Sequence, residues 1–452
     1  MKKELEFFDK LVKKLLIDEQ ETPVVEPIAT EKLASKLNLE FEDNGLSEQD
    51  WQGLVESVAL STPKTASKLF FNQLFGGRQP KAVLGDLLAV VLNNSMYTYK
   101  VAGPQVGIEK AIMHKVCSLI GYEQGDGTIA PGGSMANLMA MIMGRDKADA
   151  DSPLKGNTSN MTMYTSAESH YSIPKNAAFI GTGRENVRFV KTDGLGKIDV
   201  SDLEKQIEAD IKAGNTPYMV NATAGTTVLG AFDPIEAISK ICKKYDIWLH
   251  VDGAYCGGVI FSDDYKHLVK GIEHSDSFSF NAHKMLGTPL SCSIFVTKHR
   301  DGLYKSFSNE AEYLYQTDSD DYDLGQISLQ CGRRNDALKF WTLWKSLGNI
   351  GLKEMVDNQF HLAKVALDYC KTNPDYSVYS YDNSVSVCFI YKGINARKLC
   401  THLYENAMAM VGYGKFNGDE FVRLVTINAR NTEKEIIHFF KTLEKGAEEL
   451  LN

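Results

Sequence analysis

One lysine and one aspartate stand where an α/β enzyme could use them together. Segment 277–281 alternates apolar and polar residues, as a half-buried strand does, and Lys284 follows it closely. The apolar segment 247–251 reads as a buried strand that ends at Asp252. Ligands of open α/β sheets bind beyond the carboxyl ends of the strands. The sequence therefore predicts an amine and a carboxylate at one edge of a sheet.

This pair of side chains indicates a particular cofactor. Pyridoxal phosphate binds to a lysine amine through its aldehyde, and it needs an acidic partner for its pyridine nitrogen. No metal-ligand spacing accompanies the pair, so we expect no metal. Lysine and arginine together number 49, and nearly all must be ordinary surface charges. Lys284 becomes a candidate because it follows a predicted strand and has Asp252 as a potential partner.

Two motifs resemble those of a known family. Asn-Ala-His-Lys at 281–284 and Val-Asp-Gly-Ala at 251–254 are similar to motifs of the pyridoxal-phosphate-dependent group II amino acid decarboxylases, which act on glutamate, cysteine sulfinate and aromatic amino acids. The likeness runs from about Phe70 to the C-terminal end. It implies an α/β protein of fold type I, the aspartate-aminotransferase-like fold, with a mainly parallel seven-stranded sheet and a smaller α/β C-terminal domain.

The resemblance also implies cofactor contacts. Gly133 and Ser134 open a predicted helix whose positive end would hold the cofactor phosphate, with Ser134 as its N-cap. The matching histidine of the family stacks on the pyridine ring, which gives His170 a catalytic and a cofactor-binding role. Thr227 matches a residue that touches the cofactor near Asp252. The remaining expected contacts are Ala254, Asn281, His283 and Lys284.

Four residues are expected to bind the substrate: Gln73, Phe75, Ser95 and Arg423. Phe75 and Ser95 match the cysteine sulfinate type of decarboxylase, whereas the glutamate type has a smaller polar residue and an asparagine. The Phe75 ring would shorten the pocket by about one methylene, which discriminates between substrates by only about 1–3 kcal/mol. A plain core position is the alternative for Phe75. Residues 100–104 depart from the family pattern, so we expect the pocket wall to differ there.

Arg423 lies within an apolar predicted strand, where a charge needs a partner. A substrate carboxylate could accept two hydrogen bonds from it, and an internal aspartate is the alternative.

The polar, acidic segment 313–323 is predicted to be irregular. It would suit a mobile loop that closes over the site, with Tyr322 as a catalytic proton donor. A solvated acidic turn is the alternative, and the segment is a few residues shorter than in the animal enzymes of the family.

Composition favours an enzyme that acts on a small molecule. The net charge of −9 argues against nucleic acid or an anionic membrane as a partner. The eight cysteines include no Cys-x-x-Cys pair, which is typical of reduced thiols in the cytoplasm. Acids interrupt residues 1–10, unlike a signal peptide, and no apolar run is long enough to span a bilayer. We expect a soluble cytoplasmic protein.

We expect three parts in the chain: an N-terminal helical segment at 1–85, a large cofactor-binding domain at 86–349 and a small C-terminal domain at 350–452. Within the first part, residues 4–17 form a predicted amphipathic helix. By resemblance this helix packs on a dimer partner, and packing within its own chain is the alternative. The pattern also predicts parallel strands at 161–164, 187–190, 218–222, 247–251 and 277–281.

The resemblance to this family implies a homodimeric acidic amino acid α-decarboxylase. It would release carbon dioxide while making β-alanine from aspartate, hypotaurine from cysteine sulfinate, or both. Glutamate decarboxylation to γ-aminobutyrate is the alternative. An aminotransferase of the same fold would instead yield a keto acid, and a non-catalytic scaffold would not need Lys284, Asp252 and His170.

Overall fold

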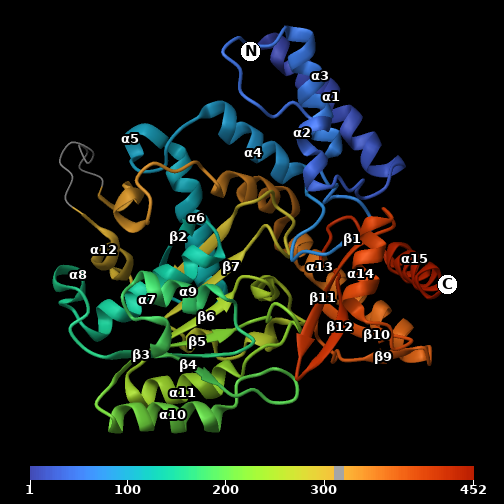
Figure 1. Cartoon of the computed structure of the whole chain (residues 1–452). Helices are drawn as coiled ribbons and strands as arrows, with labels where there is room; N and C mark the ends of the chain where they lie inside the picture. Colours follow the sequence, from blue (N-terminus) through green and yellow to red (C-terminus); the bar gives the residue numbers. More distant parts are fainter. Residues whose placement is uncertain (310–319) are drawn as a thin grey trace. The chain divides into compact units, whose positions relative to one another are not determined.

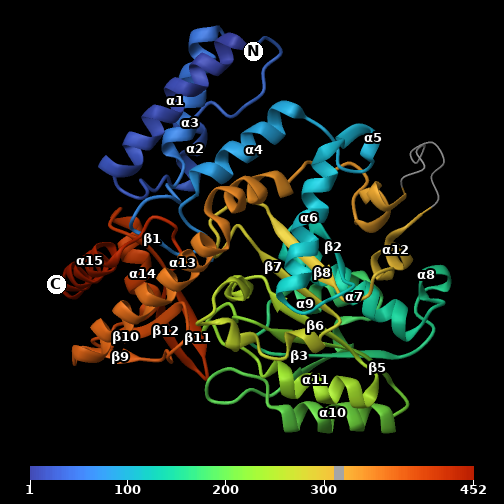
Figure 2. The ribbon, with the colours of Figure 1, turned by 180° about the vertical axis from the view of Figure 1, so that it is seen from behind.

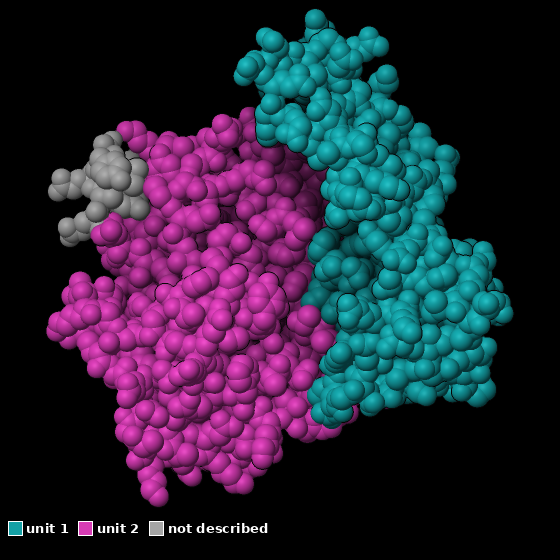
Figure 3. Space-filling view, viewed as in Figure 1, with its two compact units in different colours: residues 1–77, 362–380, 386–452 teal, residues 78–361, 381–385 magenta. Residues whose placement is uncertain are grey.

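The computed structural model describes residues 1–309 and 320–452, which fall into two compact units (Figure 1, Figure 3). Unit 1 consists of residues 1–77, 362–380 and 386–452, and unit 2 of residues 78–361 and 381–385. The N-terminal residues group with the C-terminal ones because β1 (Phe70–Phe71) pairs in parallel with β11 (Met410–Phe416). The boundaries expected at residues 85 and 349 do not account for this pairing. A strand of two residues, such as β1, is too short to produce a periodic sequence pattern.

A seven-stranded, mainly parallel sheet forms the centre of unit 2, which confirms the predicted fold class. Its strands, in spatial order, are β2 (Asp126–Ala130), β8 (Ser293–Thr297), β7 (Ser277–Asn281), β6 (Trp248–Gly253), β5 (Thr216–Thr223), β3 (Met161–Ser166) and β4 (Val187–Val190). Neighbours from β7 to β4 pair in parallel, whereas β8 runs antiparallel to both β7 and β2. The five parallel strands expected from the sequence are confirmed.

Helices cover both faces of this sheet. α7 (Gly133–Ala148) and α9 (Ser172–Phe179) lie on one side of the strands, and α10 (Val200–Lys212) and α11 (Ile235–Tyr245) lie on the other (Figure 1, Figure 2). Every residue of β3, β6, β7 and β8 is buried. Strands enclosed in this way are usually apolar throughout, so a polar side chain within them needs a partner.

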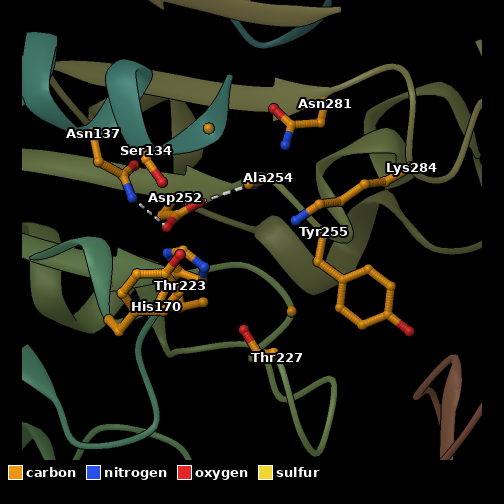
Figure 4. A pocket seen from close by; sticks show the side chains of 13 residues that line it. Ser134, Asn137, His170, Thr223, Thr227, Asp252, Ala254, Tyr255, Asn281 and Lys284 are labelled. Atoms are coloured by element: carbon orange, nitrogen blue, oxygen red, sulfur yellow. Dashed lines mark hydrogen bonds between the residues drawn. The ribbon is translucent and has the colours of Figure 1, made fainter. Parts of the chain in front are cut away.

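The core between α7 and the sheet fixes where α7 begins. Met139, Ala140 and Met143 of α7 pack in one buried cluster with Tyr218 of β5 and Trp248 of β6. This packing places the first turn of α7 near the carboxyl ends of the parallel strands (Figure 4).

Unit 1 is built on a five-stranded sheet in the order β1-β11-β12-β10-β9. β12 (Asp419–Val425), β10 (Ser386–Tyr391) and β9 (Tyr376–Val378) complete it, and every pairing other than that of β1 is antiparallel. Two helices of the unit, α14 (Ala396–Glu405) and α15 (Glu433–Leu451), contribute to the same buried cluster as the sheet. Thr432 and Glu435 form a capping box that starts α15.

The amphipathic helix expected at 4–17 lies within α1 (Lys2–Glu21). The helix packs within unit 1 through Phe7, whose ring lies 5.6 Å from the ring of Trp51 in α3 (Glu48–Ser61). Leu5, Phe8 and Ile17 remain exposed. Packing of this helix on a dimer partner stays a prediction.

The remaining α-helices of the described residues are α2 (Leu33–Lys36), α4 (Pro80–Leu92), α5 (Tyr99–Ala102), α6 (Pro104–Leu119), α8 (Ser152–Lys155), α12 (Gly302–Phe307) and α13 (Ala337–Thr372), which is interrupted at Gly348. Within residues 1–309 and 320–452, no helix combines the length and the apolar character that a membrane crossing requires.

Candidate active site

A cavity of about 210 Å³ lies in unit 2 at the carboxyl ends of the central parallel strands (Figure 4). It contains the side chains of residues from β5, β6 and β7 and from the first turn of α7. Its lining consists of Gly133, Ser134, Asn137, His170, Tyr171, Thr223, Gly225, Thr227, Asp252, Ala254, Tyr255, Asn281 and Lys284. All the predicted cofactor contacts except His283 are therefore brought together.

Asp252 is buried in the last part of β6, with 3% of its surface exposed. Its Oδ1 accepts a hydrogen bond from the Ala254 backbone N–H at 3.0 Å, and its Oδ2 accepts one from the Asn137 amide at 2.8 Å. Both partners donate, so both stabilise a negative charge on the carboxylate. A buried carboxylate held in this way can attract and keep a proton on a ring nitrogen.

Lys284 follows β7 in a tight turn. Its backbone N–H donates to the Asn281 carbonyl at 3.0 Å, and its own carbonyl accepts from the Gly287 N–H at 3.2 Å. The turn directs the side chain into the cavity from the side of β7, while Asp252 enters from the end of β6 (Figure 4). β6 and β7 are neighbours in the sheet, so the amine and the carboxylate share one cavity.

His170 stands in the cavity as a neutral imidazole. Burial lowers the pKa of His170 below its ordinary value; the Asp252 carboxylate opposes this shift and the Lys284 ammonium reinforces it. The His170 Nδ1 accepts the Ser172 backbone N–H at 3.2 Å and lies 2.8 Å from the Ser172 hydroxyl. A neutral aromatic ring held in place by two bonds can cover the face of a planar cofactor.

The first turn of α7 lines the cavity with Gly133 and Ser134. Gly132 is the N-cap, with a φ of 120° that favours glycine, so the expected N-cap role of Ser134 is wrong. Ser134 is the second residue of the helix, and its side chain lines the cavity instead. The unbonded N–H groups at a helix start carry partial positive charge and bind phosphate.

Two buried oxygen atoms of the cavity accept no hydrogen bond from the described residues. They are Asn281 Oδ1 and Thr223 Oγ1, on side chains that are 5% and 4% exposed. Buried polar atoms nearly always have partners, so these two indicate a polar ligand. An amine, a carboxylate, a helix start and unpartnered polar atoms together fit pyridoxal phosphate. Among the described residues no group of His, Cys, Asp and Glu side chains is placed to hold a metal ion.

Comparison with known proteins identifies the family. The model of the pyridoxal-dependent decarboxylase conserved domain matches residues 31–392. The chain belongs to the pyridoxal-dependent decarboxylase family. It is therefore a pyridoxal-phosphate-dependent amino acid decarboxylase.

The family members most similar to this decarboxylase include two named for acidic substrates. The acidic amino acid decarboxylase GADL1 of Mus musculus is 40% identical over 367 residues, which cover 80% of this chain and 67% of that protein. The cysteine sulfinic acid decarboxylase of Homo sapiens is 39% identical over 366 residues, covering 79% and 74%. The crystal structure of mouse CSAD matches with a TM-score of 0.93 and 32% identity, covering 98% of this chain and 97% of that one.

His283 is the predicted contact that does not line the cavity of this decarboxylase. Its Nδ1 accepts the Cys292 backbone N–H at 2.9 Å, in a site where the imidazole is 7% exposed. Burial, and then the charge of Lys284, lower the pKa of His283 to about 3. The residue thus fixes the turn after Lys284 as a neutral ring.

Tyr322 also lies outside the cavity lining. It is 42% exposed, and its ring lies 5.6 Å from that of Tyr99, edge to face, with the Lys110 Nζ 5.5 Å from its centre. Most of the segment expected to form a closing loop lies outside the described residues. Its closure and the role of Tyr322 as proton donor stay predictions.

The predicted substrate residues lie in both units. Ser95 belongs to unit 2, where its hydroxyl accepts the Arg333 backbone N–H at 3.3 Å. The other three belong to unit 1: Gln73, Phe75 and Arg423. The Arg423 guanidinium donates to the Asn72 carbonyl at 2.9 Å, so it lies beside the segment that carries Gln73 and Phe75. Phe75 is half-buried, with its ring 6.1 Å from that of Phe70.

The sequence did not single out Asn137, Thr223 or Tyr255 as cavity residues. Asn137 could have been found, because it follows Ser134 by three positions and so faces the same side of the helix. Thr223 is the last residue of β5, where a chemistry-bearing side chain is expected. Tyr255 gave no such signal, since its position depends on the turn after β6.

Proposed function

We propose that this enzyme removes the α-carboxylate of a small acidic L-amino acid. Aspartate would give β-alanine, and cysteine sulfinate would give hypotaurine. The observation that carries the proposal is the placement of Lys284 and Asp252 in one cavity that the start of α7 also lines. The acidic substrates in the names of the similar proteins support the substrate class.

Each side chain of the cavity has a defined task in this reaction. Bound pyridoxal phosphate supplies an electron sink that accepts the electron pair left at Cα when carbon dioxide departs. The Lys284 amine would attach the cofactor, Asp252 would hold a proton on its ring nitrogen, and the start of α7 with Gly133 and Ser134 would bind its phosphate. His170, neutral and held by Ser172, would cover one face of the ring.

Release of carbon dioxide has to be followed by protonation of Cα. The Lys284 Nζ can deliver that proton, because its side chain enters the same cavity. Tyr322 is the second candidate donor. The product keeps the amino group and gains one hydrogen at Cα in place of the carboxylate, which distinguishes this reaction from transamination.

The substrate side chain is proposed to meet Gln73, Phe75, Ser95 and Arg423. Arg423 would bind the acidic group that the product retains, because a firm grip on the departing carboxylate would stabilise the bound substrate more than the transition state. Phe75 would limit the length of the substrate, which favours aspartate and cysteine sulfinate over glutamate.

A panel assay tests this function. Carbon dioxide release would be measured with aspartate, cysteine sulfinate, glutamate, tryptophan and tyrosine, for the wild type, for Phe75→Ser and for Phe41→Ser as a control on a fully exposed phenylalanine of the same unit. We expect the wild type to prefer the two shorter acids and Phe75→Ser to gain activity on glutamate by about tenfold. Preference for an aromatic amino acid, or keto acid without carbon dioxide, would reject the proposal.

We also propose that the enzyme is a cytoplasmic homodimer. Leu84, Leu88 and Val91 form an exposed apolar stripe on α4, which is a surface that a second copy could cover. Among the described residues no two cysteines form a disulfide bond, in keeping with a reducing compartment. Sedimentation should give twice the chain mass, and Leu84→Lys with Leu88→Lys should shift it towards one chain. A wild-type monomer would contradict the proposal.

A further inference from the structure

Asn137 connects the two side chains that would sit around the cofactor ring. It lies on α7 with 1% of its surface exposed. Its Nδ2 donates to Asp252 Oδ2 at 2.8 Å and to the Ser172 hydroxyl at 3.1 Å, and Ser172 in turn contacts His170. One amide group therefore bonds to the carboxylate directly and to the imidazole through a single hydroxyl.

The orientation of this amide follows from the residues behind it. An ionised Asp252 can only accept, so the Asn137 Nδ2 faces it and the Asn137 Oδ1 faces His250 Nε2, at 3.1 Å. His250 is fully buried, and burial lowers its pKa to about 4, so it is neutral and carries one ring hydrogen. That hydrogen must be on Nε2, because Oδ1 is an acceptor.

The other nitrogen of His250 completes the chain of donors. With the hydrogen on Nε2, His250 Nδ1 accepts from the Ser277 hydroxyl at 2.9 Å, and Ser277 accepts from the Trp248 indole N–H at 2.9 Å. Indole can only donate. Every bond from Trp248 to Asp252 thus has a single direction.

The backbone of Ser172 fixes the tautomer of His170. The Ser172 backbone N–H can only donate to His170 Nδ1, and the Ser172 hydroxyl, which accepts from Asn137, has its hydrogen free to donate to the same nitrogen. Nδ1 therefore has no hydrogen, and the hydrogen of the neutral ring is on Nε2.

We infer that Asn137 is a positioning residue that holds both the Asp252 carboxylate and the Ser172 hydroxyl that contacts His170, with His250 and Ser277 setting the direction of its amide. Removal of its side chain takes one donor from the carboxylate and one from Ser172. The inference rests on the binding of pyridoxal phosphate in this cavity, as the proposed function does, but it does not depend on which amino acid is the substrate.

Cofactor binding without substrate tests the inference. The dissociation constant of pyridoxal phosphate and the pH titration of the bound cofactor's absorbance would be measured for the wild type, Asn137→Ala and Asn137→Asp. Asn335→Ala is the matched control, since Asn335 is also 1% exposed and makes two hydrogen bonds away from the cavity. We expect about tenfold weaker binding and a shifted titration for both Asn137 variants, and neither change for the control.

A second variant separates the bond from Asn137 to Asp252 from the bond between Asn137 and Ser172. It remains informative if Asn137→Ala does not fold. Ser172→Ala keeps the bond between Asn137 and Asp252, so its cofactor affinity should stay within about twofold of the wild type. Its His170, observed by ¹⁵N NMR of the histidine-labelled holoenzyme, should keep the Nε2–H form, because the backbone N–H of residue 172 still donates to Nδ1.

Two results would overturn the inference: unchanged affinity and titration in the folded Asn137 variants, or an Nδ1–H form of His170 in the wild type. Failure of the substrate assignment would alter neither measurement, because no amino acid is present in them.

Discussion

Gly133 and Ala254 approach so closely that a Cβ built on Gly133 would lie 3.1 Å from the Ala254 Cβ. The same atom would lie 3.0 Å from the Asn281 amide nitrogen. The start of α7 therefore meets the segment after β6 and the last residue of β7 with no room for a side chain. This close approach leaves the backbone of the helix start open to the cavity, where a phosphate would bind.

The substitution Gly133→Ala should weaken cofactor binding. The new methyl group would displace Asn281 or Ala254 by a few tenths of an ångström, and we expect the dissociation constant of pyridoxal phosphate to rise by about tenfold. Gly107→Ala is the control, because Gly107 lies on α6, where a Cβ would meet no atom within 4 Å, and the variant should gain up to about 1 kcal/mol of stability. Equal cofactor affinity in wild type and Gly133→Ala would exclude this role for the glycine.

Lys284→Arg should retain the fold and lose the reaction. The guanidinium keeps the positive charge but cannot form the covalent bond to the cofactor, so carbon dioxide release should fall by about a thousandfold or more. After borohydride treatment the wild type should carry the cofactor on the peptide that contains residue 284, and the variant should carry none. Lys298→Arg, on a lysine paired with Asp276, is the control and should behave as the wild type. A label on any other lysine would disprove the assignment.

Acid should destabilise the protein through its buried neutral histidines. The pKa of His250 is lowered by burial to about 4 in the folded state, against an ordinary value of 6.5. The unfolded chain therefore binds more protons between pH 6.5 and 4, and the free energy of unfolding falls as the pH falls through this window. The contribution of His250 is about 3 kcal/mol.

His250→Gln isolates this contribution. Glutamine can still donate to Asn137 but does not titrate. The slope of unfolding free energy against pH gives the difference in bound protons between the unfolded and folded states, and between pH 6.5 and 4 this difference should decrease by about one. Urea denaturation of both proteins at several pH values measures the slope. His438→Gln, on a histidine whose side chain lies on the surface helix α15, provides the comparison. An unchanged slope in His250→Gln would show that His250 is already protonated or exposed in the folded state.

The sequence was informative where a strand-like hydrophobic pattern ends at a residue that can take part in the reaction. The alternation before Lys284 and the apolar run before Asp252 predicted two strands, and their adjacency in a parallel sheet brings both residues into one cavity. The sequence was less informative about hydrogen-bond partners. Ser134 was expected as a helix cap, but the backbone of Gly132 takes that position.

Hydrogen-bond partners that lie on elements far apart in the sequence could not be predicted from residue spacing. Asn137, Ser172 and His250 belong to three separate elements, and only the folded sheet brings their polar atoms within 3.1 Å. The same holds for unit 1, where a two-residue strand at Phe70 joins the C-terminal sheet. Such contacts depend on tertiary packing, which a single sequence does not encode as a local pattern.

A buried ion pair supports the segment that carries Ser95. The Arg333 guanidinium makes two bonds to the Glu109 carboxylate, at 2.7 and 2.8 Å, and the two side chains are 5% and 1% exposed. The backbone of Arg333 donates to the Ser95 hydroxyl and accepts from the Met96 N–H at 2.9 Å. The position of Ser95 therefore depends on that of Arg333.

Glu109→Gln should destabilise the enzyme by about 3–5 kcal/mol, because it leaves the Arg333 charge buried without a counter-charge. Combining it with Arg333→Met removes that charge and should restore part of the stability. The folded protein of each variant should show a raised KM for the acidic substrate, because the hydrogen bonds by which Arg333 holds Ser95 and Met96 are weakened. Asp151→Asn, which breaks an exposed pair with Lys155, should cost less than about 1 kcal/mol and leave KM unchanged. A Glu109→Gln variant as stable as this control would mean that the pair is hydrated in solution.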